Sequence, residues 1–232
     1  MDTIHIQSFI TAPPEAVWRH LLDRPDVVLD ALPVTRWPDQ REERDPSRLA
    51  VAWPAGIGAA LTRVEITLAP VAGGTQVDLR HEGWPEGPAS QDAVAGHFAG
   101  WLQALAALGL LVESGRDARA SSASLGGRQR YFASAEIPAG ASAVYRALTD
   151  PAVLPRWSGG ALAGAELVEA VEDGYARWTL AASDGDGPRE LVMILRHTPR
   201  GTHCALAEYG VQGRSSSARW PQMLERLAQF LR

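Results

Sequence analysis

The chain has 232 residues, 46% of them hydrophobic and 21% charged, which is typical of a soluble protein with a packed core. Cys204 is the only cysteine, which excludes an intrachain disulfide framework and favours a reducing compartment. The start, MDTIHIQSF, lacks the features of a signal peptide, and we expect no apolar segment long enough to span a bilayer. The sequence therefore predicts a cytoplasmic protein with no membrane span.

The distribution of charge argues against a nucleic-acid partner. All 22 basic residues are Arg, which together with 22 Gly and 16 Pro indicates a GC-rich bacterial genome. Residues 1–113 carry 15 acidic and 8 basic side chains, a net charge of −7, whereas residues 114–232 carry 12 and 14, a net charge of +2. Binding to nucleic acid needs a concentrated basic face. We therefore expect no nucleic acid as a partner.

The first half of the chain predicts a strand, a helix, further strands and a long helix. IHIQSFI (4–10) alternates as a strand does, and a helix opens after it at Pro13–Pro14. LTRVEITL (61–68) and TQVDLRH (75–81) also alternate, and the turn between them makes them a hairpin. The final helix is predicted to pack through an apolar seam made of Val94, Phe98, Trp101, Leu105, Leu108 and Val112.

The second half repeats the first. APPEAVWRHLLD (12–23) aligns with AGASAVYRALTD (139–150), and GTQVDLRHEGW (74–84) aligns with GTHCALAEYGV (201–211), both at an offset of 127 residues. One offset on both sides of a dissimilar middle indicates a duplicated domain. The last seam returns as Trp220, Leu224, Leu227 and Leu231.

The order of elements predicts an α+β fold in which an antiparallel sheet curves around a long C-terminal helix and can leave a cavity beside it. SGRDARASSASLGGR, at 114–128, is poor in large apolar residues and has the composition of a linker. We predict domain 1 at residues 1–113, this linker, and domain 2 at residues 129–232.

Several of these segments resemble a known family. LTDPAVLPRW (148–157), DPSRLAVAW (45–53), the hairpin at 61–85 and the GW…L..L helix are similar to activator of Hsp90 ATPase homologue-like proteins of the START/SRPBCC superfamily. The resemblance implies two tandem helix-grip domains, and both copies look short by one hairpin. The first copy departs from the pattern, because LLDRPDVVLDALP replaces LTDPAVLPRWSGG and the Trp that usually follows this helix is missing. The superfamily implies binding of hydrophobic small molecules, occasional cyclase or hydrolase chemistry, and chaperone regulation in one eukaryotic branch.

His81 is the first candidate for a ligand contact. It continues the inward phase of Val77 and Leu79, whereas its neighbour Glu82 points to the opposite face of the strand. At the offset of 127, His81 becomes Glu208, so both copies place an ionisable group at one inward position. A cavity that holds water or ligand explains this placement, and so does a strand end that water reaches.

Trp residues form the second group of candidates. Trp101 and Trp220 lie at equivalent points of the final helices, and Trp53 and Trp178 lie on predicted strands in apolar phase. Their rings either line a pocket or fill the core. We predict His81, Glu208, Trp53, Trp101, Trp178 and Trp220 as ligand-binding residues.

No motif predicts catalysis, a metal site or a cofactor. Adjacent strand residues face apart, so neither His81–Glu82 nor His203–Cys204 forms a pair there. No HExxH or other spaced metal-ligand set occurs.

We predict a non-catalytic binding protein for hydrophobic or amphipathic small molecules. The alternatives are an enzyme of the polyketide cyclase/aromatase type, with His81 as the proton-transferring group, and a module that interacts with a chaperone. The duplication can also make the chain a monomeric pseudo-dimer that needs no further partner.

Overall fold

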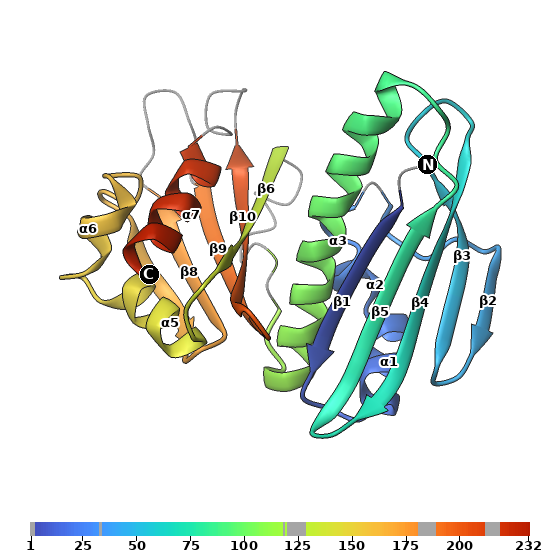
Figure 1. The fold of residues 1–232 in the computed structure, drawn as a ribbon, viewed down its shortest axis with the longest axis horizontal. Coiled ribbons are helices and arrows are strands. Elements are labelled where there is room, and N and C mark those ends of the chain that lie inside the picture. The colour runs from blue at the N-terminus through green and yellow to red at the C-terminus, as the bar shows by residue number, and fades with distance from the viewer. Residues whose placement is uncertain (1–2, 33, 118, 120–128, 181–188, 212–218) are drawn as a thin grey trace. The chain divides into compact units, whose positions relative to one another are not determined.

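The computed structural model describes residues 3–32, 34–117, 119, 129–180, 189–211 and 219–232. The chain divides into two compact units, Met1–Asp117 (domain 1) and Ala118–Arg232 (domain 2). Each unit contains one sheet and its own helices (Figure 1). The predicted linker at 114–128 lies mostly outside the described residues.

Domain 1 is built on a five-stranded antiparallel sheet with the order β1-β5-β4-β3-β2. Its strands are β1 (Ile4–Ile10), β2 (Arg41–Arg44), β3 (Arg48–Pro54), β4 (Leu61–Val71) and β5 (Gly74–Glu82). Its helices are α1 (Pro14–Asp23), α2 (Pro25–Val28) and α3 (Pro88–Ser114).

Domain 2 repeats this plan with the sheet order β6-β10-β9-β8-β7. Its strands are β6 (Gln129–Ile137), β7 (Glu166–Val171), β8 (Tyr175–Leu180), β9 (Arg189–Thr198) and β10 (Gly201–Val211). Its helices are α5 (Ala141–Thr149), α6 (Leu154–Ser158) and α7 (Arg219–Phe230). Two sheets of the same strand order confirm the predicted α+β tandem duplication.

The Gly-Thr pair that both copies share closes the same corner in each domain. A Cβ at Gly74 would lie 2.2 Å from the carbonyl oxygen of Ile10, and a Cβ at Gly201 would lie 2.2 Å from that of Ile137. Only glycine allows this approach of two backbones. The next residue, Thr75 or Thr202, donates its hydroxyl to the carbonyl of Ala12 or Ala139, at 2.6 and 2.7 Å. The repeated Gly-Thr pair therefore marks the point where the hairpin contacts the segment that leads into the first helix of each domain.

The long helix α3 packs through a face that differs from the predicted seam at one position. Trp101, Leu105 and Leu108 are buried as expected, but Phe98 is 43% exposed and the prediction for it is wrong. His97 lies on the buried face instead, at 7% exposure. His97 precedes Trp101 by four residues and Phe98 precedes it by three, so the helical period allows either one to share the buried face of Trp101. In the structure the more polar residue, His97, is the buried one.

The same helix corrects the expectation about membrane spans. Pro88–Ser114 is long and apolar enough to cross a bilayer by length and composition. However, 67% of its most apolar window is buried within the structure. The helix is the core helix of domain 1.

The tryptophan that the first copy lacks after its first helix is supplied from further along the chain. In domain 2, Trp157 donates its indole N–H to the carbonyl of Ala147 at 2.9 Å. In domain 1, Trp37 donates to the carbonyl of Leu21 at 2.8 Å and is 3% exposed. Both indoles therefore bond to the last turn of the first helix, although their sequence positions differ.

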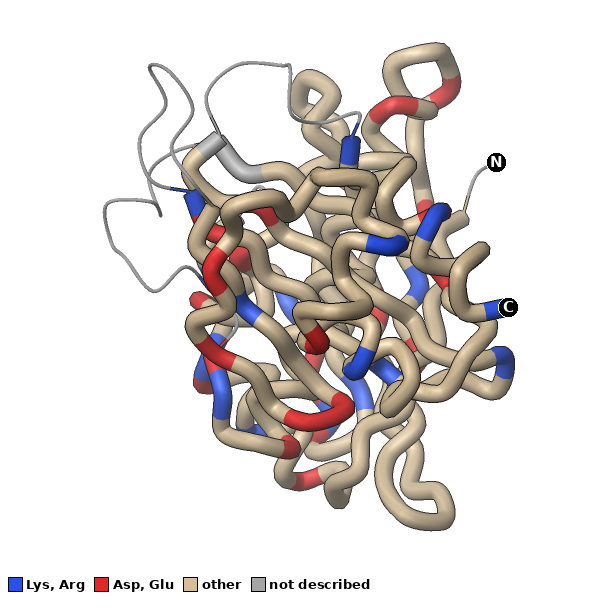
Figure 2. The backbone as a smooth tube through the Cα atoms, turned by 90° about the vertical axis from the view of Figure 1, so that its left-hand side faces the viewer, with Lys and Arg blue, Asp and Glu red and all other residues tan. Residues whose placement is uncertain are grey.

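Charged side chains cover the outer face of the domain 1 sheet. Asp78 accepts hydrogen bonds from His5 at 2.7 Å and from Gln7 at 3.0 Å, and Arg48 donates to Glu65 at 2.8 Å. Figure 2 shows positive and negative positions interspersed along the described backbone. Such mixed pairs are typical of a solvated sheet face.

Candidate functional site

Six aromatic rings meet between the sheet and α3 of domain 1. The His81 ring lies 4.2 Å from that of Trp84, 5.2 Å from that of His97 and 6.3 Å from that of Trp53, measured between centroids. Trp53 also lies 4.9 Å from Trp101. We call this group the aromatic cluster: Trp37, Trp53, His81, Trp84, His97 and Trp101.

A directional chain of hydrogen bonds holds His81. The indole N–H of Trp101 can only donate, and it lies 3.0 Å from Nδ1 of His81, so Nδ1 accepts. The ring proton is therefore on Nε2, which donates to Oγ1 of Thr62 at 2.7 Å. The Thr62 hydroxyl in turn donates to the carbonyl of Trp53 at 3.0 Å. Both ring nitrogens of His81 and the hydroxyl of Thr62 therefore have hydrogen-bond partners.

This series of hydrogen bonds requires His81 to be neutral. A second ring proton on Nδ1 would face the indole N–H of Trp101, which places two donors against each other. His81 is 0% exposed, and burial followed by repulsion from His97 lowers its pKa to about 3. The ring is therefore uncharged at neutral pH and serves as an interior hydrogen-bonding bridge.

Substitutions of Thr62 test this series of hydrogen bonds directly. We expect Thr62→Val to lower the free energy of unfolding by about 2 kcal/mol, because it leaves the Nε2–H of His81 and the carbonyl of Trp53 without partners. Thr62→Ser, which keeps the hydroxyl, is expected to lose less than half of that amount. Urea unfolding of both variants measures the difference, and equal losses would contradict a stabilising role of the Thr62 hydroxyl.

Two polar atoms of the aromatic cluster have no partner among the described residues. His97 donates from Nδ1 to the carbonyl of Ala93 at 2.9 Å, so its Nε2 carries a lone pair. That Nε2 and the indole Nε1 of Trp53 are both buried without a hydrogen bond. Burial lowers the pKa of His97, which keeps the ring neutral. The cluster thus holds one unpartnered acceptor and one unpartnered donor.

A pocket of about 320 Å³ adjoins the cluster where β5 leads into α3. It is lined by Trp84, Pro85, Glu86, Gly87, Pro88, Ser90 and Gln91. Trp84 belongs both to the pocket wall and to the cluster, since its ring lies 5.0 Å from that of His97. A second hollow of about 440 Å³, formed by Thr11–Pro14, Pro70, Val71, Gly73 and Gly74, lies at the opposite end of the sheet.

Domain 2 has a charged counterpart of the His81 bridge. Glu208 is 0% exposed, and its Oε2 accepts from the indole of Trp220 at 2.6 Å. Its Oε1 accepts from Arg189 at 3.2 Å and from Arg219 at 2.9 Å. The guanidinium of Arg219 also lies 4.2 Å above the Trp220 ring. A buried carboxylate is thereby paired with two cations and one indole.

The two copies differ in both residues of one side-chain pair. Position 62 corresponds to 189 and position 81 to 208, so the neutral Thr62–His81 pair is replaced by the ionic Arg189–Glu208 pair. The indole of the C-terminal helix donates to this site in each case. The fold therefore keeps a tryptophan donor and accommodates either a neutral or an ionic partner for it.

The structure separates the predicted site residues into two groups. Trp53, His81 and Trp101 meet in domain 1, whereas Glu208 and Trp220 bond in domain 2. Trp178 is 1% exposed in the domain 2 core, where it pairs with Leu191, whereas Trp53 pairs with Thr62. Trp53 and Trp178 are therefore not equivalent in the repeat: at the offset of 127, Trp178 corresponds to position 51, two residues before Trp53 on the same face of the strand. A ligand role for all six residues stays a prediction.

Sequence reasoning missed several residues that complete these sites, among them His97, Arg189, Trp84 and Arg219. His97 could have been found because it precedes Trp101 by four residues and so shares its helix face. Arg189 could have been found because it occupies the position of Thr62 at the repeat offset of 127 residues. Trp84 and Arg219 give no periodic pattern, since each lies beside a turn or the start of a helix.

Among the described residues, no group of three His, Cys, Asp or Glu side chains is placed to hold a metal ion. Cys204 is fully buried, and burial raises the pKa of its thiol to about 12. The thiol is therefore protonated and has no nucleophilic character at neutral pH.

The sheets, the long C-terminal helices and the buried cluster between them define helix-grip domains. Residues 34–113 match the family model of activator of Hsp90 ATPase homolog 1-like protein. Domain 1 is therefore similar to this family over those residues. No curated protein sequence matches the chain.

Solved structures with similar folds include single-domain and di-domain proteins. DynU16, a protein in the dynemicin biosynthetic locus, is 17% identical with a TM-score of 0.44, over 99% of this chain and 94% of that one. StfQ, the di-domain ARO/CYC of the steffimycin biosynthetic pathway, is 9% identical with a TM-score of 0.36, over 98% of each chain. The Aha1 dimer from Colwellia psychrerythraea is 17% identical with a TM-score of 0.39, over 50% of this chain and 99% of that one.

Proposed function

We propose that this protein is a non-catalytic, cytoplasmic, helix-grip protein that binds a hydrophobic or amphipathic small molecule in domain 1. The observation that carries this proposal is the pocket beside Trp84, which adjoins a buried cluster with two unpartnered polar atoms. Its volume of about 320 Å³ is at the lower end of the range for small-molecule sites. Apolar walls with a few polar groups are the usual composition of such sites, and this pocket combines Trp84, Pro85 and Pro88 with Glu86, Ser90 and Gln91.

The state of His81 supports binding in preference to chemistry. An acid–base residue works best when its pKa lies near the working pH, and the pKa of His81 is about 3. Both of its ring nitrogens are already engaged, and the repeat carries Glu208, paired with two Arg residues, at the same point. The cyclase-type alternative relied on His81 for proton transfer, so the geometry favours the binding protein.

The chaperone alternative has no comparable support. Large exposed hydrophobic residues among the described positions are spread over several elements rather than gathered in one patch. They are Leu61, Val71, Phe98, Leu167 and Val168.

Filling the pocket tests the proposal. The full-length protein is titrated with the uncharged fluorescent probe N-phenyl-1-naphthylamine, and we expect saturable binding. Gln91→Trp fills the pocket from an exposed helix position and is expected to weaken binding at least tenfold. Asp92→Trp is the matched control, because Asp92 is also exposed but does not line the pocket, and it should change affinity less than twofold.

Two results would contradict the proposal. The first is the absence of saturable binding by the unmodified protein. The second is equal affinity of the Gln91→Trp and Asp92→Trp variants, which would place the probe outside this pocket.

A further inference from the structure

Two nitrogen atoms of the aromatic cluster restrict the hydrogen-bonding groups that a ligand of this pocket should carry. The indole N–H of Trp53 is a buried donor without a partner, and Nε2 of His97 is a buried acceptor without one, among the residues described. Buried polar groups of native proteins are nearly always hydrogen-bonded, so each such atom calls for a partner that the chain itself does not supply. The two rings lie within 6.3 Å and 5.2 Å of the same His81 ring.

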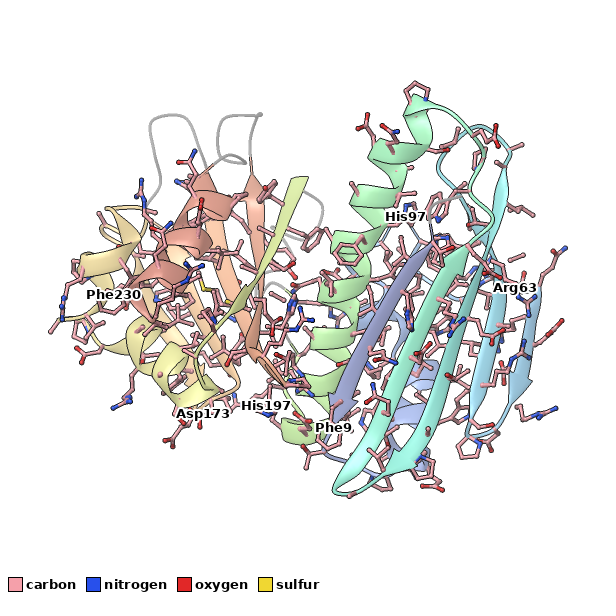
Figure 3. All side chains as sticks on the ribbon, in the orientation of Figure 1. Phe9, Arg63, His97, Asp173, His197 and Phe230 are labelled. Carbon is pink, nitrogen blue, oxygen red and sulfur yellow. The ribbon has the colours of Figure 1, made fainter. Side chains whose placement is uncertain are left out.

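The pocket and the aromatic cluster share Trp84 and one face of α3. Ser90 lines the pocket, and Ser90 and His97 are seven residues apart on α3, so they share one helix face. Figure 3 shows His97 on the side of α3 that faces the sheet. Trp84 lines the pocket and also contacts the His97 ring, and its indole donates to the carbonyl of His81 at 3.2 Å. Access from the pocket to the two unpartnered atoms requires a rotation of the Trp84 side chain, which breaks this one bond.

The charges around this space disfavour an ionic ligand. His81 is held neutral by its hydrogen bonds and burial, His97 is held neutral by its burial, and Trp53 and Trp84 are uncharged. An ion that left water for these neutral walls would lose its hydration without gaining a counter-charge. Glu86 is the charged residue that lines the pocket, and its exposed carboxylate repels an approaching anion.

We propose that the ligand of domain 1 is an uncharged aromatic molecule with a hydroxyl group that accepts from Trp53 Nε1 and donates to His97 Nε2. A hydroxyl suits both atoms because it has one donor hydrogen and two acceptor lone pairs. Aromatic rings suit the walls because they pack edge-to-face or offset against Trp and His. The inference rests on the proposed binding function and adds the chemical class of the ligand.

The test uses matched probes on the full-length protein: naphthalene, 2-naphthol, 2-methoxynaphthalene, 2-naphthoate and 2-naphthylmethylammonium. We expect 2-naphthol to bind at least tenfold more tightly than naphthalene, and both ions to bind at least tenfold more weakly than 2-naphthol. The methoxy compound accepts but cannot donate, so its affinity should lie between those of naphthalene and 2-naphthol.

Two variants assign the contacts. His97→Phe keeps a ring of similar shape and should lower the affinity for 2-naphthol at least fivefold while leaving 2-methoxynaphthalene unchanged. Trp53→Phe removes the donor and should weaken the binding of 2-naphthol and 2-methoxynaphthalene but not that of naphthalene. Thermal unfolding establishes that each variant is folded, and because the variants act on different atoms, either one alone can decide its half of the proposal.

The outcomes separate the two levels of the account. If none of the five probes binds, the binding function itself fails. If naphthalene binds and Gln91→Trp abolishes this, but 2-naphthol shows no advantage, the binding function stands and the ligand class is overturned. Equal binding of 2-naphthoate and 2-naphthol, or an unchanged 2-naphthol affinity in both variants, overturns it as well.

Discussion

Glu208→Gln is expected to lower the free energy of unfolding of domain 2 by about 3 kcal/mol or more, because removing one partner of a buried ion pair strands the others. The carboxylate is 0% exposed and accepts from Arg189, Arg219 and Trp220. Gln keeps an acceptor for the indole but has no charge to balance the guanidiniums. The loss should therefore come from electrostatics and not from packing.

Hydrogen–deuterium exchange measures this loss in the right domain. Amides of β9 and β10 should exchange faster in Glu208→Gln, whereas those of β4 and β5 should be unaffected. Glu225→Gln, an exposed change on α7 of the same domain, is the control and should alter stability by no more than about 0.5 kcal/mol. If the two variants exchange alike, Glu208 is not the centre of a stabilising ionic cluster.

Acid is expected to destabilise domain 1 through His81. The pKa of His81 is about 3 in the folded protein against an ordinary value of 6.5, so between these values the unfolded state binds the proton and the folded state does not. Stability is therefore fully present above pH 6.5 and falls as the pH drops towards 3, by about 1.4 kcal/mol per pH unit at most for one such group. His97, whose pKa is also lowered by burial, adds to the loss in the same direction.

The measurement is the exchange of β4 and β5 amides at several pH values between 7 and 4, corrected for intrinsic exchange rates. His81→Gln retains one donor and one acceptor but does not titrate, so its stability should depend on pH less steeply than that of the unmodified protein. A His81→Gln variant with the same slope as the unmodified protein would remove His81 from the acid response.

Local patterns predicted the parts of the fold that depend on strand alternation. The strand at residues 4–10 begins and ends as predicted, and Val77, Leu79 and His81 are all buried, with Glu82 exposed on the other face. The inward position of Glu208 followed from the repeat alone. Water at a strand end, one explanation for these ionisable groups, does not apply, since His81 and Glu208 are both 0% exposed.

The contacts of these groups could not be predicted, because they depend on pairing across strands. Thr62 reaches His81 only through the register of β4 with β5 and of β3 with β4, in which Trp53 lies opposite Thr62. The sequence between residues 34 and 60 has little alternation that could set this register. Trp37 was missed for a similar reason: its bond to the Leu21 carbonyl bridges a longer loop than the one before Trp157.

The indole N–H resonances of the eight tryptophans provide the most direct test of ligand binding in domain 1. Each peak of a ¹H–¹⁵N spectrum is assigned with single Trp→Phe variants, and the full-length protein is then titrated with 2-naphthol. We expect the Trp53 peak to move downfield and saturate as its N–H gains an acceptor, the Trp84 peak to shift with it, and the Trp178 and Trp220 peaks to stay in place. A Trp53 peak that does not move at saturating probe, or shifts confined to the domain 2 tryptophans, would contradict the account.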